Sequence, residues 1–247
     1  MTEISLLFLG APTVLFDDRP YLFERTKSIA LLSYLVVTAR PQSRDWLAHL
    51  LWSDSKSGRT QVRVALAELT STPLVQYLAT TREQIGFNSE GVTTDIPTTT
   101  KSQSPVVADM DILHTIYRGD FLQGLTVKNA PDFERWQRTQ TTRYRLWFES
   151  QLESIVQQCL RQEQYHLAIP HVEKVLEHDP LNERFCRYAI LLWSKLSERH
   201  RAVNIYQRLQ TELAPFDMQP EHTTQLLFQQ LDSARWIQLQ DIAELFD

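Results

Sequence analysis

Two arginines and a glutamine stand close together in a segment with helical periodicity. Arg59, Gln61 and Arg63 fall in the range 59–71, whose apolar residues recur at spacings of four and three. That spacing predicts a helix with one buried face and turns the polar side chains outward. The apolar stripe consists of Val62, Leu66 and Leu69.

The outward residue types match the edges of DNA bases. An arginine can donate two hydrogen bonds to guanine, a glutamine can pair with adenine, and an exposed methyl group can contact thymine. An alternative is equally consistent with this segment: Arg59 and Arg63 are four residues apart and could be solvated cations on an ordinary amphipathic helix. The base-contacting set would be Arg59, Thr60, Gln61, Arg63 and Val64.

Two neighbouring segments could contact phosphates. Ser43 and Arg44 begin the predicted helix 43–52 and could offer backbone amides and a guanidinium, or simply form a helix cap with an exposed arginine. Arg82, preceded by Thr81, lies in a predicted turn between two strands, where a wing would reach the DNA. The adjacent Glu83 opposes such a contact.

The order of elements around these residues predicts an N-terminal winged helix. Short strands are expected at 4–9 and 13–16, then helices at 26–40, 43–52 and 59–71, then a hairpin series with strands at 78–81, 85–87 and 92–95. Trp46 and Trp52 are expected in the core. We predict a DNA-binding domain over 1–98, a linker over 99–107, and a helical domain over 108–247.

The second half of the chain repeats itself. A shift of 34 residues aligns Ala168 with Ala202 and Val172 with Tyr206. A period of this length, with a small residue where paired helices meet, is typical of tetratricopeptide repeats. The fold class is therefore α+β, a winged helix with a short N-terminal sheet, three helices and a C-terminal hairpin, followed by an all-α tetratricopeptide-like repeat domain.

An aromatic concentration with interleaved arginines occupies 132–149. Aromatic and arginine side chains together could stack on nucleic acid. A long helix whose rings are buried in the protein is the interpretation that we prefer.

Composition limits the other classes of function. The net charge is -5, so DNA binding has to come from local charge. Cys159 and Cys186 lack metal-ligand or redox spacing, no histidines are spaced as ligands on a helix, and no glycine-rich phosphate loop occurs. We expect a cytoplasmic protein that is not an enzyme, with no metal, no cofactor and no membrane span.

Several strings, in this order, resemble the Streptomyces antibiotic regulatory protein type of bacterial transcriptional regulator. They are KSIALLSYL at 27–35, SRDWLAHLLW at 43–52, GRTQVRVALAEL at 58–69, YRGDFLQG at 117–124 and FERW at 133–136. The resemblance implies an OmpR-type winged helix followed by a bacterial transcriptional activator domain. One departure is that Glu68 and Thr70 stand where the family usually has basic residues.

The resemblance also implies partners. It makes 59–71 the helix that contacts bases, and the duplex would be a promoter with directly repeated half-sites. The polar segment 53–58 corresponds to a loop that faces RNA polymerase, with Asp54 and Lys56 as the contacts. The helical repeats could hold a second copy or another protein. The alternative function is an interaction module whose winged helix no longer binds DNA.

Overall fold

A computed structural model of the chain describes residues 2–97, 113 and 115–232. The chain forms two compact units, Met1–Phe148 and Glu149–Asp247. Each is described by itself below. The predicted linker 99–107 lies outside the described residues, so the predicted division of domains stays a prediction.

The first unit opens with a four-stranded sheet. It consists of β1 (Ile4–Leu7), β2 (Thr13–Phe16), β3 (Arg19–Tyr21) and β7 (Thr93–Thr94), in the order β3-β2-β1-β7. The first three strands are antiparallel neighbours, and β7 pairs with β1 in parallel. The prediction that 92–95 extends the later hairpin series is therefore wrong.

Asp95 explains why the chain returns to the first sheet. Its carboxylate accepts the backbone N–H of Phe8 at 2.7 Å and that of Leu9 at 2.8 Å. These two donors directly follow β1, so Asp95 fixes the segment after β7 at the end of that strand. A side chain that joins residues 86 and 87 positions apart has no local sequence signature.

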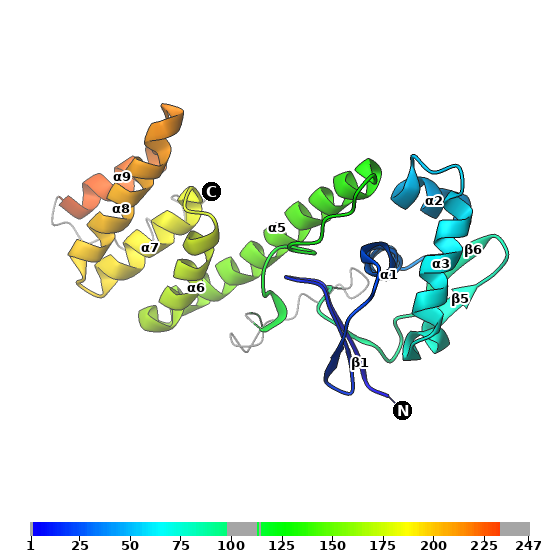
Figure 1. The fold of residues 1–247 in the computed structure, drawn as a ribbon. Helices are drawn as coiled ribbons and strands as arrows, with labels where there is room; N and C mark the ends of the chain where they lie inside the picture. Colours follow the sequence, from blue (N-terminus) through cyan, green and yellow to red (C-terminus); the bar gives the residue numbers. More distant parts are fainter. Residues whose placement is uncertain (1, 98–112, 114, 233–247) are drawn as a thin grey trace. The chain divides into compact units, whose positions relative to one another are not determined.

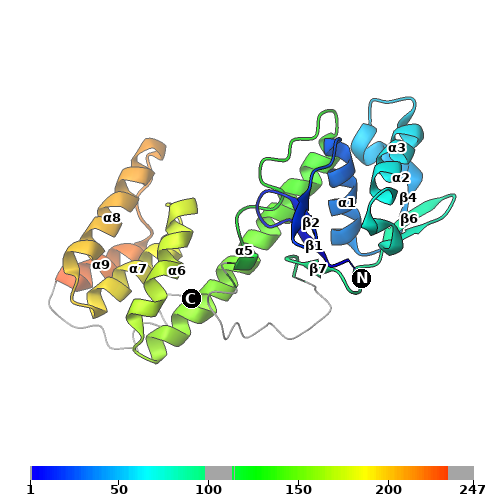
Figure 2. The ribbon, with the colours of Figure 1, turned by 60° about the horizontal axis from the view of Figure 1, so that its bottom comes forward.

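Three helices follow close to the predicted ranges, as α1 (Thr26–Thr38), α2 (Arg44–Trp52) and α3 (Gly58–Thr70). Ser43 caps α2, since its hydroxyl oxygen accepts the N–H of Trp46 at 3.1 Å. Helices α2 and α3 approach closely at Gly58, where a Cβ atom would lie 3.0 Å from the Cβ of Ala48. Figures 1 and 2 both show α3 between α1 and a β-hairpin.

That hairpin belongs to a second, three-stranded sheet. It contains β4 (Gln42–Ser43), β5 (Leu78–Thr80) and β6 (Gln84–Phe87) in the order β4-β6-β5, and a 3-10 turn (Pro73–Tyr77) connects α3 to it. The turn between β5 and β6 holds Thr81, Arg82 and Glu83. The strand 42–43, unpredicted from the sequence, joins the start of α2 to the hairpin.

The segment 117–124 also packs into the first unit. Leu122 donates its N–H to the carbonyl of Phe8 at 2.8 Å, and Arg118 donates its N–H to the carbonyl of Leu9 at 3.1 Å. The ring of Phe121 is 1% exposed and meets Trp136 edge-on at 5.6 Å between centroids. The beginning of α5 (Pro131–Arg161) therefore shares a core with the winged helix, up to Phe148.

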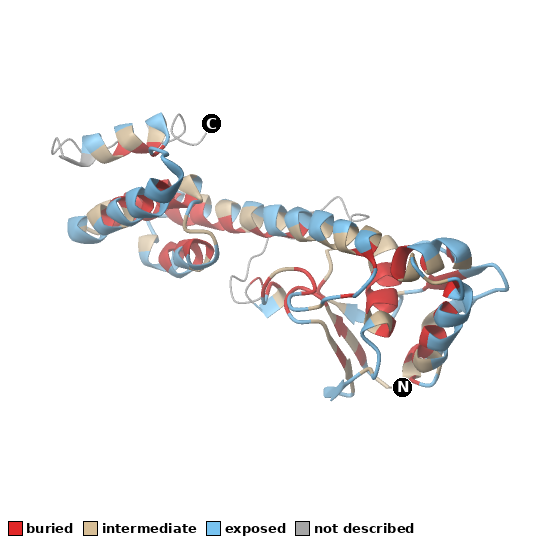
Figure 3. Cartoon of the chain, turned by 45° about the horizontal axis from the view of Figure 1, so that its top comes forward, coloured by how far each residue is buried: buried red, intermediate tan, exposed pale blue. Residues whose placement is uncertain are grey.

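The second unit is helical and repeats with the predicted period. Its helices are the end of α5, then α6 (Tyr165–His178), α7 (Glu183–Lys195), α8 (Arg199–Leu213) and α9 (His222–Asp232). Buried residues mark the faces where the helices meet (Figure 3), and α7 is buried continuously over 185–193.

The backbone turns show the repeat most directly. Glu163 and Ser197, 34 positions apart, both have positive φ, at 59° and 61°. The residue after each donates its N–H, at 2.8 Å, to the carbonyl of the fifth residue before it. Ala168 and Ala202, aligned from the sequence, are both fully buried. The predicted fold class, a winged helix followed by tetratricopeptide-like helices, is confirmed.

Candidate nucleic-acid interface

The outer face of α3 is exposed. Thr60, Arg63, Val64 and Ala67 lie on it, while the apolar stripe predicted from the sequence is 0% to 7% exposed. Within the described part of the chain, the guanidinium of Arg63 has no hydrogen-bond or ion-pair partner. This face therefore presents one cation, Arg63, beside small side chains that carry methyl groups.

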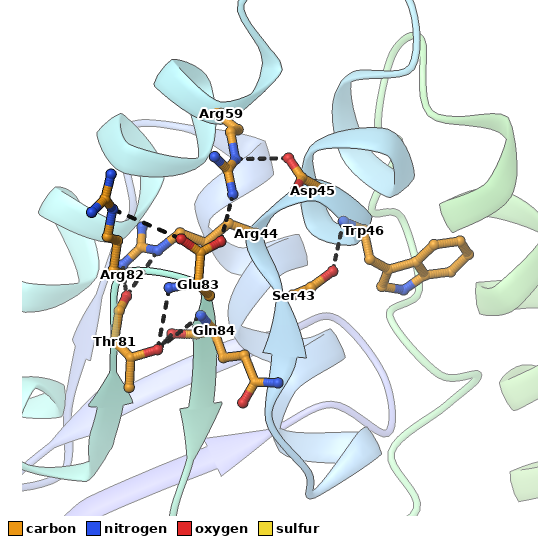
Figure 4. Close-up of polar contacts among 9 residues, drawn as sticks. All are labelled: Ser43, Arg44, Asp45, Trp46, Arg59, Thr81, Arg82, Glu83 and Gln84. Atoms are coloured by element: carbon orange, nitrogen blue, oxygen red, sulfur yellow. Dashed lines mark hydrogen bonds and ion pairs between the residues drawn. The ribbon is translucent and has the colours of Figure 1, made fainter.

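Arg59, one turn earlier, is already engaged. Its Nε lies 2.7 Å from Oδ1 of Asp45, and its Nη2 donates to Oε2 of Glu83 at 3.0 Å (Figure 4). The two acids come from α2 and from the β5–β6 turn, so the guanidinium joins three elements. All three side chains remain more than half exposed. A base contact by Arg59 would require it to exchange at least one of these carboxylates.

The turn between β5 and β6 forms the wing. The Arg82 side chain is 97% exposed, and its Nε lies 3.8 Å from Glu83. The hydroxyl oxygen of Thr81 accepts the N–H of Gln84 at 2.9 Å and that of Glu83 at 3.3 Å, which fixes the turn. Arg82 thus extends into solvent from a fixed turn, and Thr81 serves to build that turn.

The start of α2 is tied to this wing. Arg44 donates from Nε and Nη2 to the carbonyl of Thr81 at 3.1 and 3.0 Å, and its own N–H bonds to the carbonyl of Glu83 at 2.9 Å. The Ser43 hydroxyl is used as the helix cap. The two residues predicted to contact phosphate therefore also hold the wing and α2 in register (Figure 4).

Glu68 does not present its charge to the outer face of α3. Its side chain is 8% exposed, and its carboxylate accepts from the N–H of Glu24 at 2.6 Å and the hydroxyl of Ser28 at 2.5 Å. Arg25 lies 3.6 Å from the same group. The acidic residue that departs from the family pattern therefore fixes the beginning of α1 to α3.

The connection between α2 and α3 is short and accessible. Asp54 and Lys56 are exposed in it, as a partner-contacting loop requires. The prediction that Trp46 belongs to the core is wrong, because it is 43% exposed. Its indole N–H donates to the Tyr34 hydroxyl at 2.8 Å, so the polar edge of the ring has a hydrogen-bond partner within the protein. The rest of the side chain is partly exposed to solvent.

Sequence reasoning missed the acids that hold Arg59. Asp45 lies 14 positions before Arg59 and Glu83 lies 24 after it, so no helical spacing connects them. The only available signal is that Glu83 follows Arg82, which indicates an unfavourable charge on the wing. It does not indicate that Glu83 pairs with Arg59. The tertiary fold alone brings the three side chains together.

The aromatic residues of α5 belong to the packed side of the helix, as we expect from the sequence: three are buried and the two tryptophans are half-buried. Phe133, Tyr144 and Phe148 are 0% to 4% exposed. Trp136 meets Tyr34 of α1 at 4.8 Å between ring centroids. This cluster therefore forms core, and the candidate interface is confined to α3, the wing and the start of α2.

The described residues offer no alternative site of the kinds that the sequence could have hidden in its fold. They contain no group of three or more histidine, cysteine, aspartate or glutamate side chains able to hold a metal ion. Among the same residues, no helix is both long and apolar enough to cross a membrane. Burial raises the pKa of both cysteine thiols, that of Cys186 to about 12, as expected for small buried side chains.

Comparison with known proteins gives a family match for the second half of the chain and a fold match for nearly all of it. A family model described as the bacterial transcriptional activator domain matches residues 109–232. A solved structure of Mycobacterium tuberculosis EmbR, in complex with a low-affinity phosphopeptide, has a similar fold with a TM-score of 0.69 at 17% identity. The similarity covers 99% of this chain and 69% of that one. No curated protein matches.

Proposed function

Since the chain belongs to the bacterial transcriptional activator domain family, we propose that it binds promoter DNA in a sequence-specific way, with α3 in the major groove and the wing on the adjacent backbone. The observation that carries this proposal is the outer face of α3, where Arg63, which has no partner among the described residues, shares the face with Thr60 and Val64. A helix of this diameter fits the major groove, and these side-chain types match guanine and thymine edges.

The charge distribution supports local binding. The whole chain has a net charge of -5, yet Arg63 and Arg82 are exposed on α3 and the wing while Glu68 is buried behind them. With few free cations, non-specific attraction is weak, and base contacts must supply a larger share of the affinity. Two protomers on directly repeated half-sites would add to it, and we propose this arrangement for the promoter.

The loop between α2 and α3 is the proposed contact with RNA polymerase. Asp54 and Lys56 are exposed there, immediately before the helix that would lie in the groove. A polymerase bound to the same promoter could therefore reach the loop without displacing α3. This role belongs to an activator, in agreement with the family.

The experiment begins without a known operator. The full chain is used to select duplexes from a random-sequence pool, and the affinity for the selected duplex is measured by fluorescence anisotropy. We expect an enriched motif, and we expect Arg63→Ala to lose about 1–3 kcal/mol, or about 5- to 150-fold in affinity.

The matched control is Arg161→Ala, which removes an exposed arginine in the second compact unit. It should bind the selected duplex like the unaltered chain. Enrichment of no sequence would overturn the proposal in favour of a winged helix that has lost DNA binding. Equal affinities of the two variants for an enriched duplex would overturn the placement of Arg63 at the bases.

A further inference from the structure

A cavity of about 330 Å³ adjoins α3, separate from the wing contacts. Gln61 and Val64 of α3 line it, together with the beginning of α1, Trp52 of α2 and the segment 126–128. Gln61 is about 200° around the helix from Arg59, since successive residues differ by about 100°. The cavity therefore lies on the side of α3 that faces the beginning of α1, whereas Arg59 contacts the wing on the other side.

The charges that line this cavity are all positive. Arg25, Lys27 and Lys128 contribute to its wall, and no acidic residue does. Arg25 is partly neutralised by Glu24 and Glu68, at 3.5 and 3.6 Å. Lys128 is exposed and, in the described part of the chain, makes no hydrogen bond or ion pair. Lys128 therefore adds a positive charge to this wall that no described acid neutralises, and such a charge attracts an anion.

Lys27 is held in place at the cavity wall. Its ammonium donates to the carbonyl of Leu51 at 2.5 Å and lies 5.2 Å from the centroid of the Trp52 ring. Burial lowers the pKa of Lys27, and the charge of Asp54 acts in the opposite direction. An ammonium group has three donors, so a fixed Lys27 can still donate to an anion in the cavity.

We propose that this cavity binds a backbone phosphate of the DNA, with Lys128 and Lys27 as its cationic contacts. The inference rests on the proposed function, and it adds a second phosphate site on the side of α3 opposite the wing. The shared wall supports DNA as the occupant, since Val64 lies both on the outer face of α3 and in the cavity lining. A helix in the major groove has phosphates on both of its sides.

This site would give the activator domain a part in DNA binding. Lys128 falls within the residues that match the family model, yet it packs in the first compact unit beside α3. The contact is with phosphate, so its contribution is independent of sequence, in contrast to that of Arg63.

The test compares Lys128→Ala with Arg63→Ala in the full chain, on the selected duplex and on a scrambled duplex, over a series of salt concentrations. We expect Lys128→Ala to weaken binding to both duplexes by the same factor and to reduce the slope of log K against log salt by about 0.9. Lys174→Ala removes the same charge in the second unit and serves as the control, and thermal unfolding checks that the variants fold.

The other outcomes separate the two proposals. If Lys128→Ala matches the control while Arg63→Ala loses affinity, the phosphate site is wrong and the proposed function stands. If the unaltered chain binds no duplex, both fail. If Lys128→Ala loses binding only to purified RNA polymerase, the cavity holds an acidic protein segment, and the phosphate site is again overturned.

Discussion

Arg59 and Arg63 lie one helical turn apart and differ in what surrounds them. Arg59 is held by Asp45 and Glu83, whereas Arg63 is free among the described residues. Ion pairs between exposed side chains contribute only about 0–1 kcal/mol each, so the two acids can be exchanged for DNA at small cost. Arg63 can therefore bind DNA without first breaking an ion pair. Arg59 can do so only if DNA competes with Asp45 and Glu83 for its guanidinium.

Glu83→Gln tests this competition. The substitution removes a carboxylate from Arg59 and a negative charge from the wing, so DNA affinity should rise by up to about fivefold, the equivalent of about 1 kcal/mol. The salt dependence should become steeper by up to about 0.9 if Arg59 then contacts a phosphate.

Glu90→Gln, at an exposed glutamate in the same unit, is the control for the loss of one acid. Anisotropy titrations of both variants on the selected duplex supply the measurement. Weaker binding by Glu83→Gln would show instead that Glu83 orients Arg59 for its contact with DNA.

At the scale of elements, the crossing of α2 and α3 sets the direction of the α3 face that we propose contacts bases. Gly58 makes the close approach possible, because any Cβ there would press on Ala48 at 3.0 Å. The wing is joined to the same pair of helices through Arg44 and the backbone of Glu83. Helix α3 and the wing are thus positioned by one set of contacts at the ends of α2 and α3.

Gly58→Val should disturb this crossing. The added branched side chain overpacks the contact with Ala48, and we expect the free energy of unfolding to fall by about 1–3 kcal/mol. Ala48→Gly in the same chain should restore part of the loss, and Thr60→Val on the exposed face should change little. Chemical denaturation measures all three, and a Gly58→Val chain as stable as the original would contradict the packing argument.

Sequence patterns within single elements predict the helices well. They do not predict which distant segments pair in the folded chain. The Ser43 cap, the spacing of the apolar residues in α3 and the 34-residue repeat all act within one or two elements, and the structure bears them out. The partner of β7, the exposure of Trp46 and the acids on Arg59 depend on contacts between distant segments. Lys128 is likewise brought beside Arg25 and Lys27 only by the fold.

At the scale of the whole molecule, the first unit extends well beyond the predicted winged helix. The segment 117–124 hydrogen-bonds to Phe8, Leu9 and Gly10, and Asp95 holds the same stretch from the other direction. The Asp95 carboxylate is 2% exposed and lies 3.5 Å from Arg118. The beginning of the activator domain is therefore part of the structure that carries α3.

Asp95→Asn should loosen this junction. An amide has a single acceptor oxygen, so one of the N–H groups of Phe8 and Leu9 would face another donor, at a cost of about 1–3 kcal/mol. Asp18→Asn, in an exposed turn with a φ of 60°, is the control and should be nearly neutral. Thermal unfolding of the two variants decides, and equal midpoints would show that the buried carboxylate contributes little to stability.

The central claim, that the outer face of α3 lies against DNA, can be tested by thiol protection. Cys159 and Cys186 are 4% and 2% exposed with raised pKa values, so Thr60→Cys adds a single accessible thiol to the described residues. Ser150→Cys provides an exposed control on α5. Maleimide labelling is followed with and without the selected duplex at about ten times its Kd, where protection of a covered site should reach about tenfold. We expect about tenfold protection of the thiol at position 60 and no protection at position 150. Equal labelling of the α3 thiol with and without DNA would contradict the claim that α3 lies against DNA.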